Sequence, residues 1–321
     1  MAAAVTLFHR PAHARGMTFS IVARDPEQDA IGVAVQSKFV SVGSVVPFAS
    51  ADAGAVATQS FANVAYGPEA LDHLRKGLTA EETIEKLTED DEEAERRQVG
   101  VVGADGSIAG FTGKECFDTA LDVQGEHYTA QGNILENEET VHAMAETFEE
   151  TDGGLPERLI AALHAADEAG GDSRGKQSAA LYVVKPEGGY DGGNDRWIDV
   201  RVDDHEEPIA ELERVFKLYD VTLLTREEPD VVEEFSGATA REVAGALAEL
   251  GHLDADEADV EVFAEPQLDA LESFRGMNNF ENHSLPVLED ALARGWDDAE
   301  GEGEDRLVDA IWHGLQRLDR E

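Results

Sequence analysis

Short, mainly apolar stretches near the start of the chain are bounded by turn-forming residues, which is the pattern of β-strands. Two strand pairs are predicted, residues 18–24 with 31–35 and residues 42–51 with 53–61. Turn-forming Asp, Pro and Gly residues separate the members of each pair. Each pair therefore indicates an antiparallel hairpin.

The next 160 or so residues repeat this grouping, with helices following strands. A capping-box pattern at Thr79 and Glu82 marks one helix start. Single strands and single helices do not alternate along the chain, as they would in a parallel α/β fold. The predicted class is therefore α+β, with antiparallel sheets and helices in layers. The predicted elements are helices at 66–76, 138–150, 155–168 and 208–219, a further helix that begins after Thr79, a hairpin at 98–103 and 107–112, and strands at 128–134, 176–184 and 197–202.

The pattern changes after Asp220. Residues 222–234 are charged and loosely patterned, and short helices are predicted at 239–250, 267–274 and 305–318. The sequence thus predicts a main domain over residues 18–221 and a small, mainly helical domain over residues 222–321.

Charge excludes some functions. The chain carries 69 Asp and Glu against 25 Lys and Arg, a formal net charge of −44. Such a chain does not bind nucleic acid through a basic surface, and anionic lipid repels it. Acid spread along the whole chain is typical of haloarchaeal proteins, in which concentrated salt screens self-repulsion. With no apolar run long enough to span a bilayer, we expect a soluble, cytoplasmic protein.

Residues 1–17 differ from the rest. Met1 to Gly16 contains two arginines and no acid, and Met17 directly precedes Thr18. We interpret residues 1–17 as a mis-called start or a disordered extension, with a genuine leader as the alternative. Removal of Met17 would leave Thr18 with a free α-amine of pKa roughly 7.7–8.0, which can serve as the base for its own hydroxyl.

Five short motifs occur in order along the first part of the chain. They are TFSIVARD at 18–25, GVAVQSK at 32–38, GAVATQ at 54–59, AQGN at 130–133 and GKQSAA at 175–180. These motifs resemble the DUF1028 family of the N-terminal nucleophile (Ntn) hydrolase superfamily, whose members commonly begin at Met-Thr-Phe-Ser or carry a leader that ends just before Thr. The resemblance covers residues 17 to about 220 and implies a four-layer αββα sandwich related to proteasome subunits.

The candidate catalytic residues are Thr18, Lys38, Asn133 and Ser178. The Thr18 hydroxyl would attack an amide carbonyl. Lys38, in a position that resembles a proteasome lysine, would hold the amine pKa down, or it merely caps a strand. Asn133 would supply an oxyanion donor or is a turn residue, and Ser178 would orient the amine.

Four further polar residues, Gln59, Ser60, Gln131 and Gln177, interrupt apolar strands. They indicate either a structural network or a substrate-binding pocket, and their number favours a pocket. No His pair has metal-ligand spacing, so neither a metal nor another cofactor is expected. Cys116, the only cysteine, is interpreted as a packed side chain.

These observations predict an Ntn-type amidohydrolase that cleaves a C–N bond of a small-molecule amide through an acyl-enzyme ester at Thr18. The alternative is a non-catalytic ligand-binding or scaffold protein of the same fold. Residues 274–281, FRGMNNFE, resemble a peptidoglycan-binding-like domain. A haloarchaeal cytosol offers no peptidoglycan, so a packing or oligomerisation module is favoured, and we expect a homo-oligomer, a dimer.

Overall fold

The computed structural model describes residues 18–117, 119–224 and 236–294. The chain divides into two compact units, Met1–Glu213 and Arg214–Glu321, and each is described by itself. The predicted helix at 305–318 lies outside the described residues.

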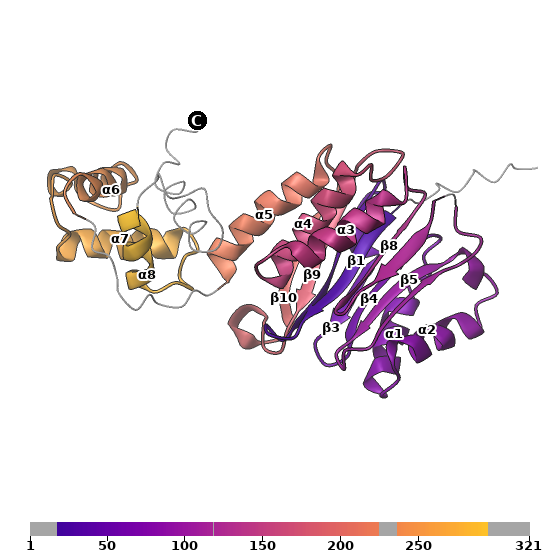
Figure 1. Ribbon diagram of the computed structural model, residues 1–321. Coiled ribbons are helices and arrows are strands. Elements are labelled where there is room, and N and C mark those ends of the chain that lie inside the picture. The colour runs from indigo at the N-terminus through magenta and orange to yellow at the C-terminus, as the bar shows by residue number, and fades with distance from the viewer. Residues whose placement is uncertain (1–17, 118, 225–235, 295–321) are drawn as a thin grey trace, which may run out of the picture. The chain divides into compact units, whose positions relative to one another are not determined.

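The first unit contains two antiparallel sheets (Figure 1). One has six strands in the order β10-β9-β2-β1-β8-β7, and the other has four in the order β3-β4-β5-β6. The predicted α+β class, with hairpin-built antiparallel sheets, is confirmed. The strands are β1 Thr18–Asp25, β2 Ala30–Ser37, β3 Pro47–Ser50, β4 Gly54–Gln59, β5 Gln98–Gly103, β6 Ile108–Thr112, β7 Leu121–Gln124, β8 Tyr128–Asn133, β9 Ser178–Val184 and β10 Arg196–Val202.

The two sheets pack face to face, and helices cover their outer faces (Figure 1). Alternate residues of β1 and β2, such as Val22 and Val33, meet Ala55 and Val102 of the smaller sheet in one apolar cluster. The helices are α1 Tyr66–Arg75 and α2 Ala80–Glu89 on the smaller sheet, and α3 Glu139–Glu150 and α4 Leu155–Glu168 on the larger sheet. Helix α5 Pro208–Leu223 has only its first residues, to Glu213, in this unit, and Glu213 contacts His164 of α4.

Local sequence signals explain several boundaries. The predicted capping box is present, since the Glu82 amide donates to Thr79 Oγ1 and the Thr79 amide donates to Glu82 Oε2. Residues 155–168 form a helix as predicted, with Pro156 in its first turn. The long strand predicted at 42–51 is wrong: Val42–Ser44 is a 3-10 turn, and only Pro47–Ser50 is strand.

The second unit is a small helical body. It contains the last part of α5, from Arg214, and the described helices α6 Ala238–Glu249, α7 Glu265–Met277 and α8 Leu285–Arg294. Leu247, Leu271, Phe274 and Leu288 lie in their shared apolar core. Helix α8 was not predicted from the sequence. None of the described helices is long and apolar enough to cross a membrane.

Candidate functional site

Thr18 is the first residue of β1, which lies between β2 and β8 inside the six-stranded sheet. It is 5% exposed, and its Oγ1 lies 3.1 Å from Ser37 Oγ on β2. Side chains alternate along a strand, and Ser20 and Val22 contact the smaller sheet. The Thr18 hydroxyl therefore faces the space between the two sheets.

A row of polar side chains crosses four neighbouring strands at this level. Thr18 pairs with Asn133 on one side and with Ser37 on the other, and Ser37 pairs with Ser178. Directly opposed residues in antiparallel strands point to the same face, so all four side chains face the smaller sheet. All four are buried.

Glutamine and asparagine amides connect this row to the smaller sheet. Gln59 Nε2 and Asn133 Nδ2 both donate to the Thr18 carbonyl at 3.3 Å, and both also donate to Gln98 Oε1, at 2.8 and 3.0 Å. Gln98 Nε2 in turn donates to the Gly132 carbonyl at 2.8 Å. These bonds fix the Thr18 backbone from both sheets, and unmade bonds at such buried groups would cost about 1–3 kcal/mol each.

A second layer of the network lies one step along the strands. Gln131 Nε2 donates to Ser20 Oγ at 2.6 Å, and Ser20 Oγ donates to Gln59 Oε1 at 2.7 Å. A Cβ on Gly100 would stand 2.3 Å from Gln131 Oε1, so only glycine leaves room for the Gln131 amide there.

A cavity of about 450 Å³ opens beside Thr18. Its size is in the range of small-molecule sites. Aliphatic and aromatic side chains form one part of its lining, and hydroxyl, amide and charged side chains form the other. The apolar residues are Phe39, Val42, Val45, Val46, Phe61 and Ala62, and the polar residues are Thr18, Gln59, Ser60, Glu93, Arg96 and Arg97.

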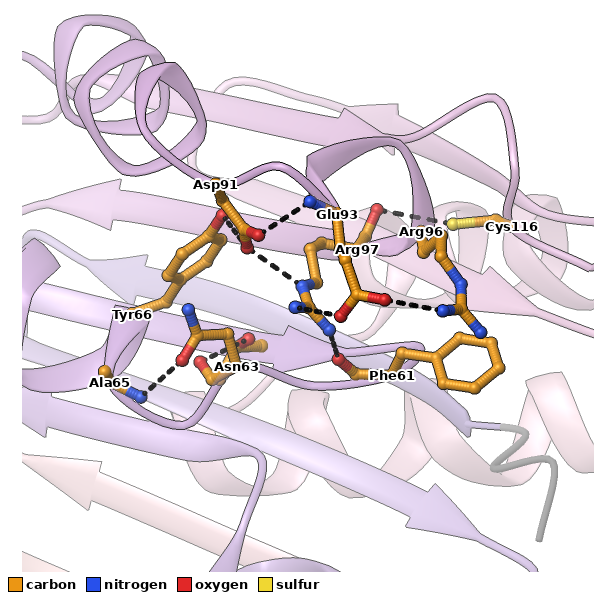
Figure 2. Close-up of polar contacts among 10 residues, drawn as sticks. Phe61, Asn63, Ala65, Tyr66, Asp91, Glu93, Arg96, Arg97 and Cys116 are labelled. Atoms are coloured by element: carbon orange, nitrogen blue, oxygen red, sulfur yellow. Dashed lines mark hydrogen bonds and ion pairs between the residues drawn. The ribbon is translucent and has the colours of Figure 1, made fainter. Parts of the chain in front are cut away.

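Ser60 and Phe61 occupy an unfavourable backbone conformation, with φ of 55° and 45°. Non-glycine residues in the left-handed region cost free energy and persist only where neighbours hold them. Arg97 Nη1 donates to the Phe61 carbonyl (Figure 2). This hydrogen bond fixes the corner that presents both residues to the cavity.

Arg97 forms a largely buried ion pair with Asp91 at the centre of a larger network (Figure 2). Its Nε donates to Asp91 Oδ2 at 3.0 Å and its Nη2 to Glu93 Oε2 at 3.2 Å. The Tyr66 hydroxyl donates to Asp91 Oδ2 at 2.8 Å. Arg96 donates from Nη1 to Glu93 Oε1 at 2.7 Å, and its guanidinium carbon lies 3.8 Å from the centre of the Phe61 ring.

The Asp91 carboxylate is strongly stabilised in its charged form. Burial by itself would raise its pKa, but hydrogen bonds from Arg97 and Tyr66 outweigh burial and lower the pKa from 3.8 to about 2. Burial, followed by the hydrogen bond to Asp91, raises the pKa of Tyr66. Burial also raises the pKa of the Cys116 thiol, which donates to the Arg97 carbonyl at 3.3 Å. This environment fits a packed cysteine and not a reactive one.

Acid is expected to weaken the fold through Asp91. A depressed folded-state pKa gives stability that is present above the unfolded value near 3.8 and is lost as pH falls through about 2. The shift corresponds to about 2 kcal/mol. We expect the free energy of unfolding of the wild type, minus that of Asp91→Asn, to shrink by about 2 kcal/mol between pH 5 and pH 2 in urea titrations. A difference that stays constant over this range would contradict the role given to Asp91.

The structure brings together several of the residues predicted for the site. Asn133 and Gln59 contact Thr18 directly, Ser60 lines the same cavity, and Gln131 reaches Gln59 through Ser20.

The other three predicted residues lie apart from the Thr18 hydroxyl. Lys38 Nζ donates to the Lys176 carbonyl at 2.8 Å, because residue 38 follows Ser37 and so leaves the face on which Ser37 meets Thr18. Ser178 belongs to the polar row, but its hydroxyl bonds the Phe39 carbonyl and the Val42 amide. Gln177 Nε2 donates to Asp204 Oδ1 at 3.0 Å and does not line the cavity.

Sequence reasoning missed Ser37, Gln98, Arg96 and Arg97. Gln98 pairs with Gln59 across β4 and β5, so the strand register could have suggested it. Ser37 ends a strand motif but was not singled out. Nothing in the local pattern indicated a role for Arg96 and Arg97. They follow an acidic run, which is typical of a solvent-exposed charged surface. Within the described ranges no group of three or more His, Cys, Asp or Glu could hold a metal ion.

Comparison with known proteins identifies the family of the first unit. The chain belongs to the "Family of unknown function (DUF1028)", whose model matches residues 18–212. Residues 222–312 match the model described as "Putative peptidoglycan binding domain". Both matches agree with the resemblances noted from the sequence.

A solved relative has the same fold. The chain is similar to the DUF1028 protein SPO2555 of Silicibacter pomeroyi, at 33% identity and a TM-score of 0.58, over 64% of this chain and 89% of that one. No curated protein matches the chain.

Proposed function

We propose that the first unit is an Ntn-type amidohydrolase, with the four-layer αββα sandwich of that superfamily and Thr18 as its N-terminal nucleophile. One observation carries the proposal. Thr18 is the first residue of an inner strand, and it lines a cavity next to buried, hydrogen-bonded polar side chains. The Thr18 hydroxyl faces the space between the sheets, 3.1 Å from Ser37 Oγ, which supports its use as a nucleophile at this cavity. The substrate class is a small-molecule amide.

The chemistry needs a chain that begins at Thr18. Its amine, directly or through one water, takes the proton from Oγ1 as Oγ1 attacks the amide carbonyl. The C–N bond then breaks, and the amine product leaves with that proton. Water hydrolyses the Thr18 ester, which releases the carboxylic acid and restores the hydroxyl.

Ser37 and Asn133 are the positioning residues in this proposal. Ser37 Oγ, at 3.1 Å, can hold the attacking hydroxyl in place. Asn133 Oδ1 is buried without a hydrogen-bond partner in the described part of the chain. A free Thr18 amine on the paired strand would supply a donor for it. Both Nδ2 hydrogens are already directed at Thr18 O and Gln98 Oε1, so Asn133 suits this role better than that of an oxyanion donor.

Roles for Lys38, Ser178 and Gln177 stay predictions, as do the dimer and the cytoplasmic location. The contacts of Lys38 and Gln177 give them no direct part in the proposed step.

The first test is the mass of the intact protein isolated from its native cell. We expect a chain that begins at Thr18, because only that chain has the amine the mechanism requires. A native chain that keeps Met17 would contradict the mechanism and favour the alternative, a non-catalytic ligand-binding protein built on the same sheets.

A further inference from the structure

Arg96 lines the cavity, and not all of its hydrogen-bond donors are used. Its Nη1 binds Glu93, and no other hydrogen bond of its guanidinium is found among the described residues. Its side chain is 34% exposed. By contrast, Arg97 is 12% exposed, and all three of its nitrogens already have partners.

The Arg96 guanidinium lies over the Phe61 ring. Its central carbon is 3.8 Å from the ring centre, and Figure 2 shows the two groups next to each other. The N–H groups of a guanidinium point outward in its own plane, and two of them on one edge can bind a planar carboxylate with two parallel hydrogen bonds. Nε and Nη2 of Arg96 form such an edge.

The neighbouring carboxylates leave the Nε and Nη2 donors of Arg96 available. Glu93 gives one carboxylate oxygen to Arg96 and the other to Arg97, and Asp91 is bound by Arg97 and Tyr66. Two arginines and two carboxylates make the cluster neutral, in a chain whose net charge is −44. An anionic group therefore meets less repulsion here than on the surface as a whole.

We propose that the cavity binds an amide with an apolar body and a carboxylate, and that Arg96 is the residue that binds the carboxylate. The amide part of this inference rests on the proposed hydrolase function, and the carboxylate part does not. Thr18 would lie at the scissile bond and Arg96 at the charged end, while Phe39, Val42, Val46 and Phe61 contact the apolar body. This assigns the substrate class as acidic amides, such as N-acyl amino acids or monoamides of dicarboxylic acids.

Binding, and not turnover, tests this proposal, so its failure is distinguishable from failure of the hydrolase mechanism. The full chain carrying Thr18→Ala is titrated calorimetrically with two isosteric probes, 4-phenylbutanoate and 4-phenylbutanamide. We expect the carboxylate to bind at least ten-fold more tightly, because a charge-assisted hydrogen bond is stronger than a neutral one. Adding Arg96→Gln should weaken carboxylate binding by about 10–100-fold and weaken amide binding much less, because the amide carries no charge.

Two further variants make the result specific. Lys114→Gln removes one positive charge from a side chain that is 89% exposed and does not line the cavity, and it should leave both affinities unchanged. Glu93→Gln removes the competing carboxylate and should tighten 4-phenylbutanoate binding. Equal affinities for the two probes, no detectable binding of 4-phenylbutanoate, or no effect of Arg96→Gln in a variant with an unchanged circular dichroism spectrum would each overturn the proposal.

Discussion

Replacement of Arg97 by methionine is expected to destabilise the first unit by about 3–5 kcal/mol, the usual cost of removing one partner from a buried ion pair. The Arg97 side chain is 12% exposed and the Asp91 side chain 13% exposed. Methionine fills a similar volume but leaves the Asp91 carboxylate with one fewer charged donor. It also releases the Phe61 carbonyl, so the strained corner at Ser60 and Phe61 loses its hydrogen bond.

The neighbouring arginine provides the matched control. Arg96 forms one ion pair, with an exposed Glu93, so Arg96→Met should change stability by less than about 1 kcal/mol. Urea unfolding followed by circular dichroism measures both variants. Equal decreases in the free energy of unfolding for the two variants would contradict the larger stabilisation assigned to the Arg97–Asp91 ion pair.

Thr18→Ala should abolish covalent reaction at the site, with a rate loss of at least about 10⁴-fold, since it removes the nucleophile. The probe is a β-lactone with an apolar side chain, applied to a chain that begins at residue 18. The hydroxyl attacks the lactone carbonyl, the ring C–O bond opens, and no atom leaves. The intact mass therefore rises by the mass of the lactone.

Thr18→Ser is the control for this experiment, because serine keeps both the hydroxyl and the amine. It should still form the adduct. The alanine variant loses one hydroxyl contact with Ser37, which corresponds to about 0.5–1.5 kcal/mol, so its fold should persist. Undiminished labelling of a folded Thr18→Ala protein would rule out Thr18 as the nucleophile.

The helices of the first unit could be predicted well because their signals are local. Residues 155–168 carry an apolar face, a proline in the first turn and glycines after the last turn, and the observed α4 is Leu155–Glu168. The segment 42–51 was misread because its turn depends on distant residues. A Cβ on Gly43 would stand 2.6 Å from Ala180 Cβ and 2.7 Å from Arg201 Cδ, a close approach that no local pattern shows.

The site was predictable only in part for the same reason. Thr18, Gln59 and Asn133 stand out as polar residues in strands, and they do meet. Which other side chains join them depends on strand register and on side-chain alternation. Ser37 rather than Lys38 contacts Thr18 because a shift of one residue reverses the face of a strand. Arg97 reaches Phe61 across 36 residues of sequence, which periodicity cannot reveal.

The most direct test of the central claim is a peptide map of the lactone-treated protein that begins at residue 18. The proposed mechanism predicts one ester, on the N-terminal Thr18, and its absence from a chain that keeps residue 17 before Thr18. An adduct on any other residue, or no adduct on the chain with the free Thr18 amine, would contradict the claim that this protein is an N-terminal nucleophile hydrolase.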